Sequence, residues 1–265
     1  RRTTRRVGGT RMTTLTPDRP DEALDGTSRT VVRLEPHPAG GRARFRLSTG
    51  GRPECPVLRP MLLDIAGSRA QVSLVPEGAM LLADDRIDID IEVGAGTHLK
   101  IVEPAGTVAY DMRGRHATWD VRIRLGSGAS LSWAGEAFVA SAGADVRRST
   151  SIVLAPDARL AMRETLVLGR YGEWPGRVRQ SSRVRHDDGA PVLIEDLDLD
   201  PVSAPSLIGR HRVVSTVLLL AGPDEVPAEV ARADRFDLDT GGVLWRRLGT
   251  DLHTTLDREC WAAVR

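Results

Sequence analysis

Three acidic residues stand at similar places in the middle of the chain and have the chemistry to hold a cation. Glu103, Glu136 and Glu164 each come four or five residues after the leucine that closes a short turn. If the units that contain these turns stack, the three carboxylates lie in a row. A buried carboxylate must be paired or must bind a cation, and oxygen ligands on strands suit weak, transient contact with a divalent ion. The alternative is that these acids pair with the abundant arginines, such as Arg170.

The turns belong to a short sequence pattern that occurs three times between residues 81 and 170. Two apolar residues six positions apart bracket each turn, and the brackets begin at Val93, Leu125 and Leu154, which are 32 and 29 residues apart. This period is typical of repeated supersecondary units. Apolar and polar residues alternate on both sides of each turn, as in Ile87–Val93, which predicts strands with one apolar face. The pattern therefore predicts a mainly β fold, a β-helical or solenoid-like stack of β-hairpins. An ordinary antiparallel sandwich is the alternative.

The remainder of the chain divides into a polar start and a β domain with a few short helices toward its C-terminus. Residues 1–41 are predicted to be flexible, with a short strand at 31–34, and residues 42–265 to form a single domain. Pro227 is placed to begin a short helix. Spacing by four predicts a terminal helix with this apolar stripe: Leu252, Leu256, Cys260 and Val264.

Composition excludes several classes of function. The net charge of +1 gives no global attraction to nucleic acid or anionic lipid, and the aromatic content of 4% argues against a surface that stacks on bases or sugars. Cys55 and Cys260 lie at opposite ends of the chain and form no disulfide framework, which fits a reducing compartment. No apolar run is long enough to span a membrane, and the first residues have no signal-peptide pattern. We therefore expect a cytoplasmic protein.

Motifs for catalysis or for a fixed metal site are missing from the sequence. No nucleophile elbow or phosphate-binding loop occurs, and the Gly-rich turns lead into further strands, which does not fit a dinucleotide site. The six histidines never occur in pairs at metal-ligand spacing, and no cysteine joins them. The sequence therefore predicts a protein that is not an enzyme and that holds no permanent cofactor.

An ordered series of motifs resembles the UreD/UreH family of urease accessory proteins. The resemblance runs from about residue 45 to the end of the chain, and its most specific part lies in residues 81–173. The motifs that carry it are Ala83–Ile91 with the turn Gly94–Gly96, Ala105–Tyr110, Leu131–Trp133, Ala158–Leu160 with Glu164, Leu168–Glu173 and Leu244–Gly249.

This resemblance implies a β-helical fold and a role in loading nickel into apo-urease. Family members bind a helical accessory protein (UreF), which recruits a GTPase (UreG) that carries nickel, and they also contact urease. They are thought to pass the ion through an internal tunnel. By position, the resemblance places Glu136, Glu164, Arg170 and Glu173 along that path or its supports, with nickel only in transit. Two other hypotheses are a β-solenoid enzyme that acts on polysaccharide through paired carboxylates, and a structural β module of a larger complex.

Overall fold

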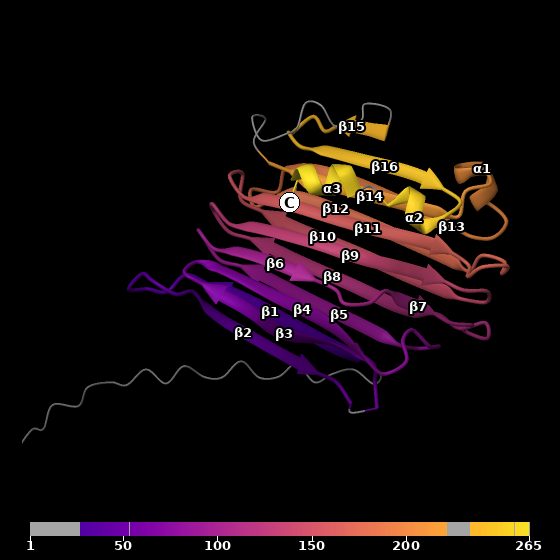
Figure 1. The fold of residues 1–265 in the computed structure, drawn as a ribbon, viewed down its shortest axis with the longest axis horizontal. Coiled ribbons are helices and arrows are strands. Elements are labelled where there is room, and N and C mark those ends of the chain that lie inside the picture. The colour runs from indigo at the N-terminus through magenta and orange to yellow at the C-terminus, as the bar shows by residue number, and fades with distance from the viewer. Residues whose placement is uncertain (1–26, 53, 222–233, 257, 265) are drawn as a thin grey trace, which may run out of the picture.

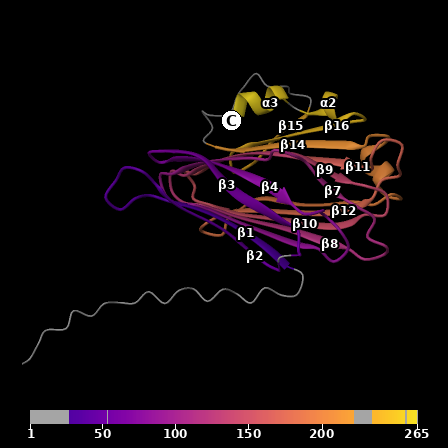
Figure 2. The ribbon, with the colours of Figure 1, turned by 60° about the horizontal axis from the view of Figure 1, so that its bottom comes forward.

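Two β-sheets lie face to face, and three short helices accompany them in the described part of the chain (Figure 1, Figure 2). The computed structural model describes residues 27–52, 54–221, 234–256 and 258–264. In spatial order, sheet A contains β13 (Pro191–Leu199), β12 (Arg177–His186), β10 (Asp145–Leu154), β8 (Ala117–Leu125), β5 (Arg86–Val93), β1 (Thr27–Glu35) and β2 (Arg44–Gly50). Sheet B contains β15 (Arg235–Asp237), β16 (Val243–Gly249), β14 (Val213–Leu220), β11 (Arg159–Leu168), β9 (Ser130–Ala140), β6 (His98–Val102), β4 (Arg69–Glu77) and β3 (Val57–Ala66), with β7 (Thr107–Ala109) also beside β9.

The chain winds between the two sheets as a solenoid, which confirms the predicted mainly β, solenoid-like fold. In each turn of the solenoid one strand lies in sheet A and the next in sheet B: β5 leads to β6, β8 to β9, and β10 to β11. Strands of successive turns pair in parallel, as β5 with β8 and β9 with β11. The stacked units are therefore not hydrogen-bonded hairpins. The two strands around each repeated turn belong to different sheets, because the turn is a corner between the sheets.

The three repeated turns stack on one another at this corner. The amide of Gly126 donates to the carbonyl of Val93 at 2.9 Å, and the amide of Ala155 donates to the carbonyl of Leu125 at 3.0 Å. A Cβ at Gly126 would lie 2.9 Å from the amide nitrogen of Ala95, so only glycine permits this close approach. The period seen in the sequence is thus the length of one solenoid turn.

The hydrophobic core fills the space between the sheets. Apolar side chains on alternate positions of each strand point inward, as Ile87, Ile89 and Ile91 on β5, which are at most 2% exposed. Burying one such side chain stabilises the fold by about 2 kcal/mol. The acidic residues between them point outward, where Asp90 pairs with Arg122 of the next turn.

The short strand predicted at 31–34 is confirmed and is longer than expected. Of the segment 1–41 expected to be flexible, Thr27–Glu35 form β1, which lies between β5 and β2 in sheet A. Val32 and Leu34 point into the core and are each 1% exposed. The strand extends beyond the predicted residues because two inward apolar residues and two strand partners hold the segment. Residues 1–26 lie outside the described residues.

Predictions for the C-terminal third are confirmed in part. The turn at 187–189 joins the antiparallel strands β12 and β13. Helix α1 (Ala204–Ile208) precedes β14. The terminal helix is divided into α2 (Leu252–Thr255) and α3 (Arg258–Val264). The helix predicted at Pro227 lies outside the described residues. None of the helices in the described part of the chain is long and apolar enough to cross a membrane.

Helix α3 covers the outer face of sheet B at its C-terminal half. Cys260, Trp261 and Val264 pack against outward-facing residues of β11, β14 and β16, and all three are at most 8% exposed. The C-terminal part of the predicted apolar stripe is therefore confirmed as a docking stripe on this chain's own sheet.

Candidate functional site

Sheet B has a local gap where three successive turns of the solenoid lose their regular pairing. The strands β6 and β7 lie one after the other beside β9, and residues 103–106 interrupt them. On the other side of β9, Arg163 pairs with Ala134 and Thr165 pairs with Ala137, so Gly135 and Glu136 stand opposite Glu164 alone. This is a β-bulge, which changes the direction of side chains locally. At this gap, groups from the inner and outer faces of the sheet meet.

Glycine at two positions makes the gap possible. A Cβ at Gly106 would lie 2.4 Å from the carbonyl oxygen of Ala137, and a Cβ at Gly135 would lie 2.6 Å from the carbonyl oxygen of Arg163. Both distances are far shorter than any non-bonded contact of a real Cβ. The irregular backbone therefore depends on residues without a side chain.

Glu103 closes the inner side of the gap. Its carboxylate accepts a hydrogen bond from the indole Nε1 of Trp133 at 2.8 Å and another from the backbone amide of Glu136 at 2.9 Å. Burial raises the pKa of Glu103 to about 7, although these two hydrogen bonds and the nearby charge of Arg148 act in the opposite direction. Near neutral pH this carboxyl group is therefore divided between its protonated and charged forms.

Glu136 lies on the outer side of the same gap. Its side chain is 43% exposed, and its carboxylate is 3.4 Å from Nη2 of Arg163. Arg163 is itself buried, because its guanidinium lies 5.7 Å from the ring centre of Trp261 on α3 and donates to the carbonyl of Gly135 at 3.1 Å. Burial lowers the pKa of Arg163. The residues of the gap thus link solvent at Glu136 with the interior at Glu103.

Glu164 belongs to a buried polar triad that joins the two sheets. Nη2 of Arg148, from sheet A, donates to Oε1 of Glu164 at 3.0 Å, and Nε2 of Gln180 donates to Oε2 at 3.3 Å. The guanidinium of Arg148 also donates to Oε1 of Gln180 at 3.1 Å and lies 4.6 Å from the ring centre of Phe138. Arg148 is 8% exposed, so its charge depends on these partners.

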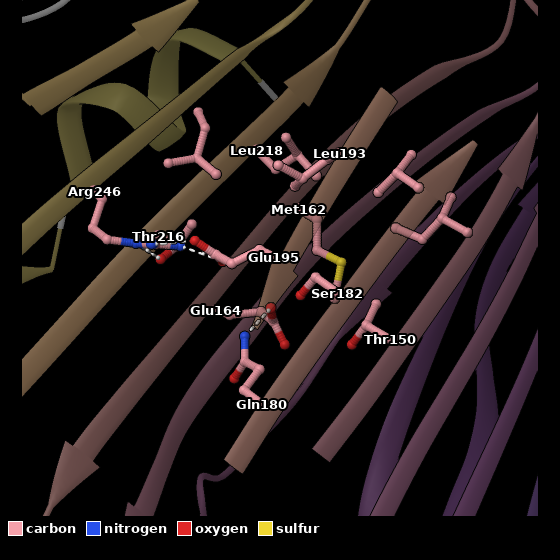
Figure 3. A pocket seen from close by; sticks show the side chains of 13 residues that line it. Thr150, Met162, Glu164, Gln180, Ser182, Leu193, Glu195, Thr216, Leu218 and Arg246 are labelled. Atoms are coloured by element: carbon pink, nitrogen blue, oxygen red, sulfur yellow. Dashed lines mark hydrogen bonds and ion pairs between the residues drawn. The ribbon is translucent and has the colours of Figure 1, made fainter. Parts of the chain in front are cut away.

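A second ion pair continues the polar interior toward the C-terminal end of the solenoid (Figure 3). Arg246 of β16 binds Glu195 of β13 through two hydrogen bonds of 2.5 and 2.8 Å, and its Nε donates to the hydroxyl of Thr216 at 3.2 Å. The ion pair joins sheet B to sheet A. Thr216 pairs with both Glu164 and Arg246 in the register of sheet B, which places the three side chains in one line across the strands.

Two small cavities follow this line and share Glu164. One is lined by Glu103, Glu136, Arg148 and Glu164 together with aromatic side chains, and the other by Glu164, Gln180, Glu195 and Arg246 together with aliphatic side chains. Each has a volume of about 30 Å³, which is room for one or two water molecules. We name the inward polar residues of this line the polar row: Glu103, Arg148, Glu164, Gln180, Glu195, Thr216 and Arg246.

Comparison with known proteins gives the family of the chain. Residues 46–263 match the family model described as UreD urease accessory protein. A urease accessory protein UreD 1 of Streptomyces griseus subsp. griseus is 40% identical over 82% of this chain and 82% of its own length. One UreD of Frankia casuarinae is 35% identical over 88% of this chain and 76% of its own length. UreD 2 of Saccharopolyspora erythraea is 34% identical over 76% of this chain and 77% of its own length. This chain belongs to the UreD family.

In this UreD-family chain, the structure separates the four residues expected along a path into two places. Glu136 and Glu164 line the same cavity, and Glu103, Glu136 and Glu164 form the row expected from the turns. Arg170 and Glu173 instead pair at 2.6 Å in the loop between β11 and β12, where their side chains are 55% and 26% exposed. They line neither cavity of the polar row.

The loop that holds Arg170 and Glu173 is a tight surface turn. Gly169 and Gly172 have φ of 77° and 76°, in the left-handed region that favours glycine. The neighbouring Trp174 is 80% exposed. The geometry is therefore that of an exposed tight turn held by an ion pair.

The UreD-family chain holds further polar-row residues that sequence reasoning missed. Arg148, Gln180, Glu195 and Arg246 were not predicted as site residues. On β10 and β12 a usable signal exists, because Arg148 and Gln180 occupy the inward phase of an otherwise apolar or small alternation. Among the described residues, no group of three or more His, Cys, Asp or Glu side chains has the arrangement of a metal site.

Proposed function

We propose that this chain is a cytoplasmic, non-catalytic scaffold of urease maturation that helps deliver nickel to the urease active site. In this proposal it binds a UreF-type helical accessory protein, a UreG-type GTPase and apo-urease. Membership of the urease accessory family supports the general role. The polar row supports the specific role, because a protein that only filled space would not place ionised groups between two apolar sheets, where each charge is costly unless it is paired.

The polar row has the chemistry of a route for a cation. Its oxygen ligands suit hard and borderline divalent ions, and its three carboxyl groups (Glu103, Glu164 and Glu195) exceed its two guanidinium groups (Arg148 and Arg246) by one. That excess attracts positive charge when Glu103 is ionised. Each carboxylate also has a protein partner, so the row is stable before a cation arrives and does not hold it as a permanent ligand cage would.

The volume of the cavities sets a condition on transport. A space of about 30 Å³ holds one or two water molecules, but not a divalent ion with its octahedral shell of water. A nickel ion that follows the polar row must therefore exchange water for side-chain oxygens, or the ion pairs must separate to widen the route. Contacts with partner proteins are the natural source of such a change.

The polysaccharide-enzyme hypothesis receives less support from the same cavities. Acids and aromatic side chains do meet at the gap, since Glu103 and Glu164 lie near Trp119, Trp133 and Phe138. A cavity with room for one or two waters, however, does not admit a sugar ring between the acids. The enclosed volume therefore favours an ion over a polysaccharide.

A test of the route uses two variants that keep side-chain shape. Glu136→Gln removes the charge at the outer side of the gap, and the double variant Arg148→Gln with Glu164→Gln removes the buried ion pair without leaving one charge alone. We expect each variant to lower nickel-dependent activation of apo-urease at least fivefold in an assay that contains the UreF-type and UreG-type proteins. The matched control replaces the exposed pair Arg33–Glu92 by glutamine on the outer face of sheet A and should activate urease as the parent chain does.

Two outcomes would contradict the proposal. If both route variants activate urease as well as the control while their thermal unfolding is unchanged, the polar row carries no nickel. If the parent chain forms no complex with a UreF-type protein at micromolar concentration, the scaffold role itself fails.

A further inference from the structure

The two outer faces of the solenoid differ in character. The outer face of sheet A carries ion pairs across neighbouring strands, as Asp90 with Arg29 and Arg122, and Asp145 with Arg179. Such a face is well solvated by itself. On the outer face of sheet B, α2 and α3 cover only β11, β14 and β16, and no element of the described residues covers β3, β4, β6, β7 or the outer side of most of β9 (Figure 1, Figure 2).

One register row of sheet B passes from the covered half into the uncovered half. Its members, in order across the strands, are Met61, Ser73, Val102, Ala134, Arg163, Val217 and Trp245. Helix α3 covers the last three, since Trp261 lies over Arg163 and clusters with Val217 and Trp245. The row continues as small and apolar side chains beyond the helix, where Met61 is 49% exposed.

A second register row repeats this arrangement nearer the strand ends. Val108, Val139, Val167 and Val213 lie side by side on β7, β9, β11 and β14. Val213 is 1% exposed beside α2, whereas the other three valines are only partly buried. In both rows, this chain's own helices bury one end. At the other end the larger apolar side chains stay partly exposed, while the small Ser73 between them is 6% exposed.

The two open ends flank the gap in sheet B. Val102 and Ala134 precede the interruption at residues 103–106 and the bulge at 135–136, while Val108 and Val139 follow them. The exposed carboxylate of Glu136 therefore stands between two apolar stretches. We name this surface the open face: Met61, Val102, Ala134, Val108, Val139 and Val167.

We propose that the open face docks an amphipathic helix of a partner protein, laid beside α2 and α3 as a continuation of their layer and over the gap at Glu136. A helix is the fitting occupant because this chain covers the same two rows with helices, and because the small side chains of Ser73 and Ala134 let a helix approach closely. Lys100, the only lysine of the chain, is exposed beside the open face, so the partner helix carries a carboxylate on that flank.

The inference rests on the proposed function for the identity of the partner, and it adds the surface on which that partner binds. A helix in this position would shield the gap from bulk water and would bring groups of the partner within reach of Glu136. A cation handed over there would meet Glu136 first and Glu103 next, since the two residues line one cavity.

The test measures binding of a purified UreF-type accessory protein to Val102→Glu and Val139→Glu variants. Both residues point outward and are partly exposed, so the folded chain tolerates the change, which thermal unfolding verifies. The matched control is Val153→Glu, a partly exposed valine on the outer face of sheet A between Arg124 and Arg185 in the register. We expect at least tenfold weaker binding for each open-face variant and less than twofold change for the control. Lys100→Glu, which cannot disturb the core, is expected to slow association.

The outcomes separate the two proposals. If the parent chain does not bind the UreF-type protein, the proposed function fails. If the parent chain binds and the Val102, Val139 and Lys100 variants bind equally well, the docking inference alone is overturned. It is also overturned if light scattering shows that the parent chain pairs with a second copy and that the open-face variants abolish this pairing instead.

Discussion

The buried carboxyl group of Glu103 makes the stability of the fold depend on pH. Burial raises its pKa from the ordinary 4.5 to about 7. Between these two values the folded chain holds a proton that the unfolded chain has released. The native state then binds more protons, so the free energy of unfolding falls as the pH rises from about 4.5 to about 7 and is constant above that range. We predict that Glu103→Gln abolishes this fall.

The size of the effect follows from the two pKa values. The difference between about 7 and 4.5 corresponds to about 3 kcal/mol, at 1.36 kcal/mol for each pKa unit. The residue keeps a partly exposed edge, which lets solvent screen the charge, so we expect about 1 to 3 kcal/mol. A glutamine amide accepts only one of the two hydrogen bonds from Trp133 and Glu136, which costs roughly 1 kcal/mol at every pH. The change with pH is therefore the quantity that reports the titration.

Urea unfolding followed by tryptophan fluorescence at pH 5 and pH 8 measures this quantity. The parent chain should lose about 1 to 3 kcal/mol more than the Glu103→Gln variant between the two pH values. Glu92→Gln is the matched control, because Glu92 is an exposed glutamate on the outer face of sheet A, and its pH dependence should follow the parent chain. Equal pH dependence in the parent chain and the Glu103→Gln variant would refute the assignment of a raised pKa to the gap.

Three further variants test the supports of the polar row by their effect on chemical unfolding. Arg246→Met leaves Glu195 as a lone, partly buried charge and should cost about 1 to 3 kcal/mol; adding Glu195→Met should restore much of this loss, and no restoration would contradict the pairing. Gly135→Ala places a methyl group 2.6 Å from the carbonyl oxygen of Arg163 and should cost about 1 to 3 kcal/mol, so an unchanged midpoint would refute the tight approach at the bulge. Trp261→Ala removes the side chain that packs over Arg163 and should cost about 3 kcal/mol or more, whereas a neutral result would mean that α3 does not hold the outer side of the gap.

The repeated turns show which features of the fold a local sequence pattern predicts and which it does not. Apolar residues six positions apart around Val93, Leu125 and Leu154 predicted strands, an inward face and a period, and the structure confirms all three. The same alternation does not say whether the two strands around a turn pair with each other or with the next copy. The pairing depends on contacts about 30 residues apart, as β5 with β8, and these are not encoded in the turn itself.

The polar row was harder to predict because it runs across the strands. Its members come from six strands and from the residue that follows β6, and Arg148 meets Glu164 only because the two sheets face each other at that level. Along its own strand each member stands among inward-facing residues that are apolar or small. The acids after the turns were found because stacking repeats their position, whereas Glu195 and Arg246 lie beyond the repeats and have no such signal.

Under the proposed role, the gap and the polar row together allow a cation to pass while every buried charge keeps a partner. A regular sheet satisfies its backbone groups and leaves no passage, whereas an open channel would leave buried charges without partners. The bulge at Gly135 and Glu136 interrupts the ladder over a short distance only, and arginines satisfy the carboxylates behind it. A cation that displaces one guanidinium at a time then finds each carboxylate already in place, and the protein regains its ion pair once the cation moves on. Such a route favours release of the cation, because every carboxylate that could bind it has a competing protein partner within hydrogen-bond distance.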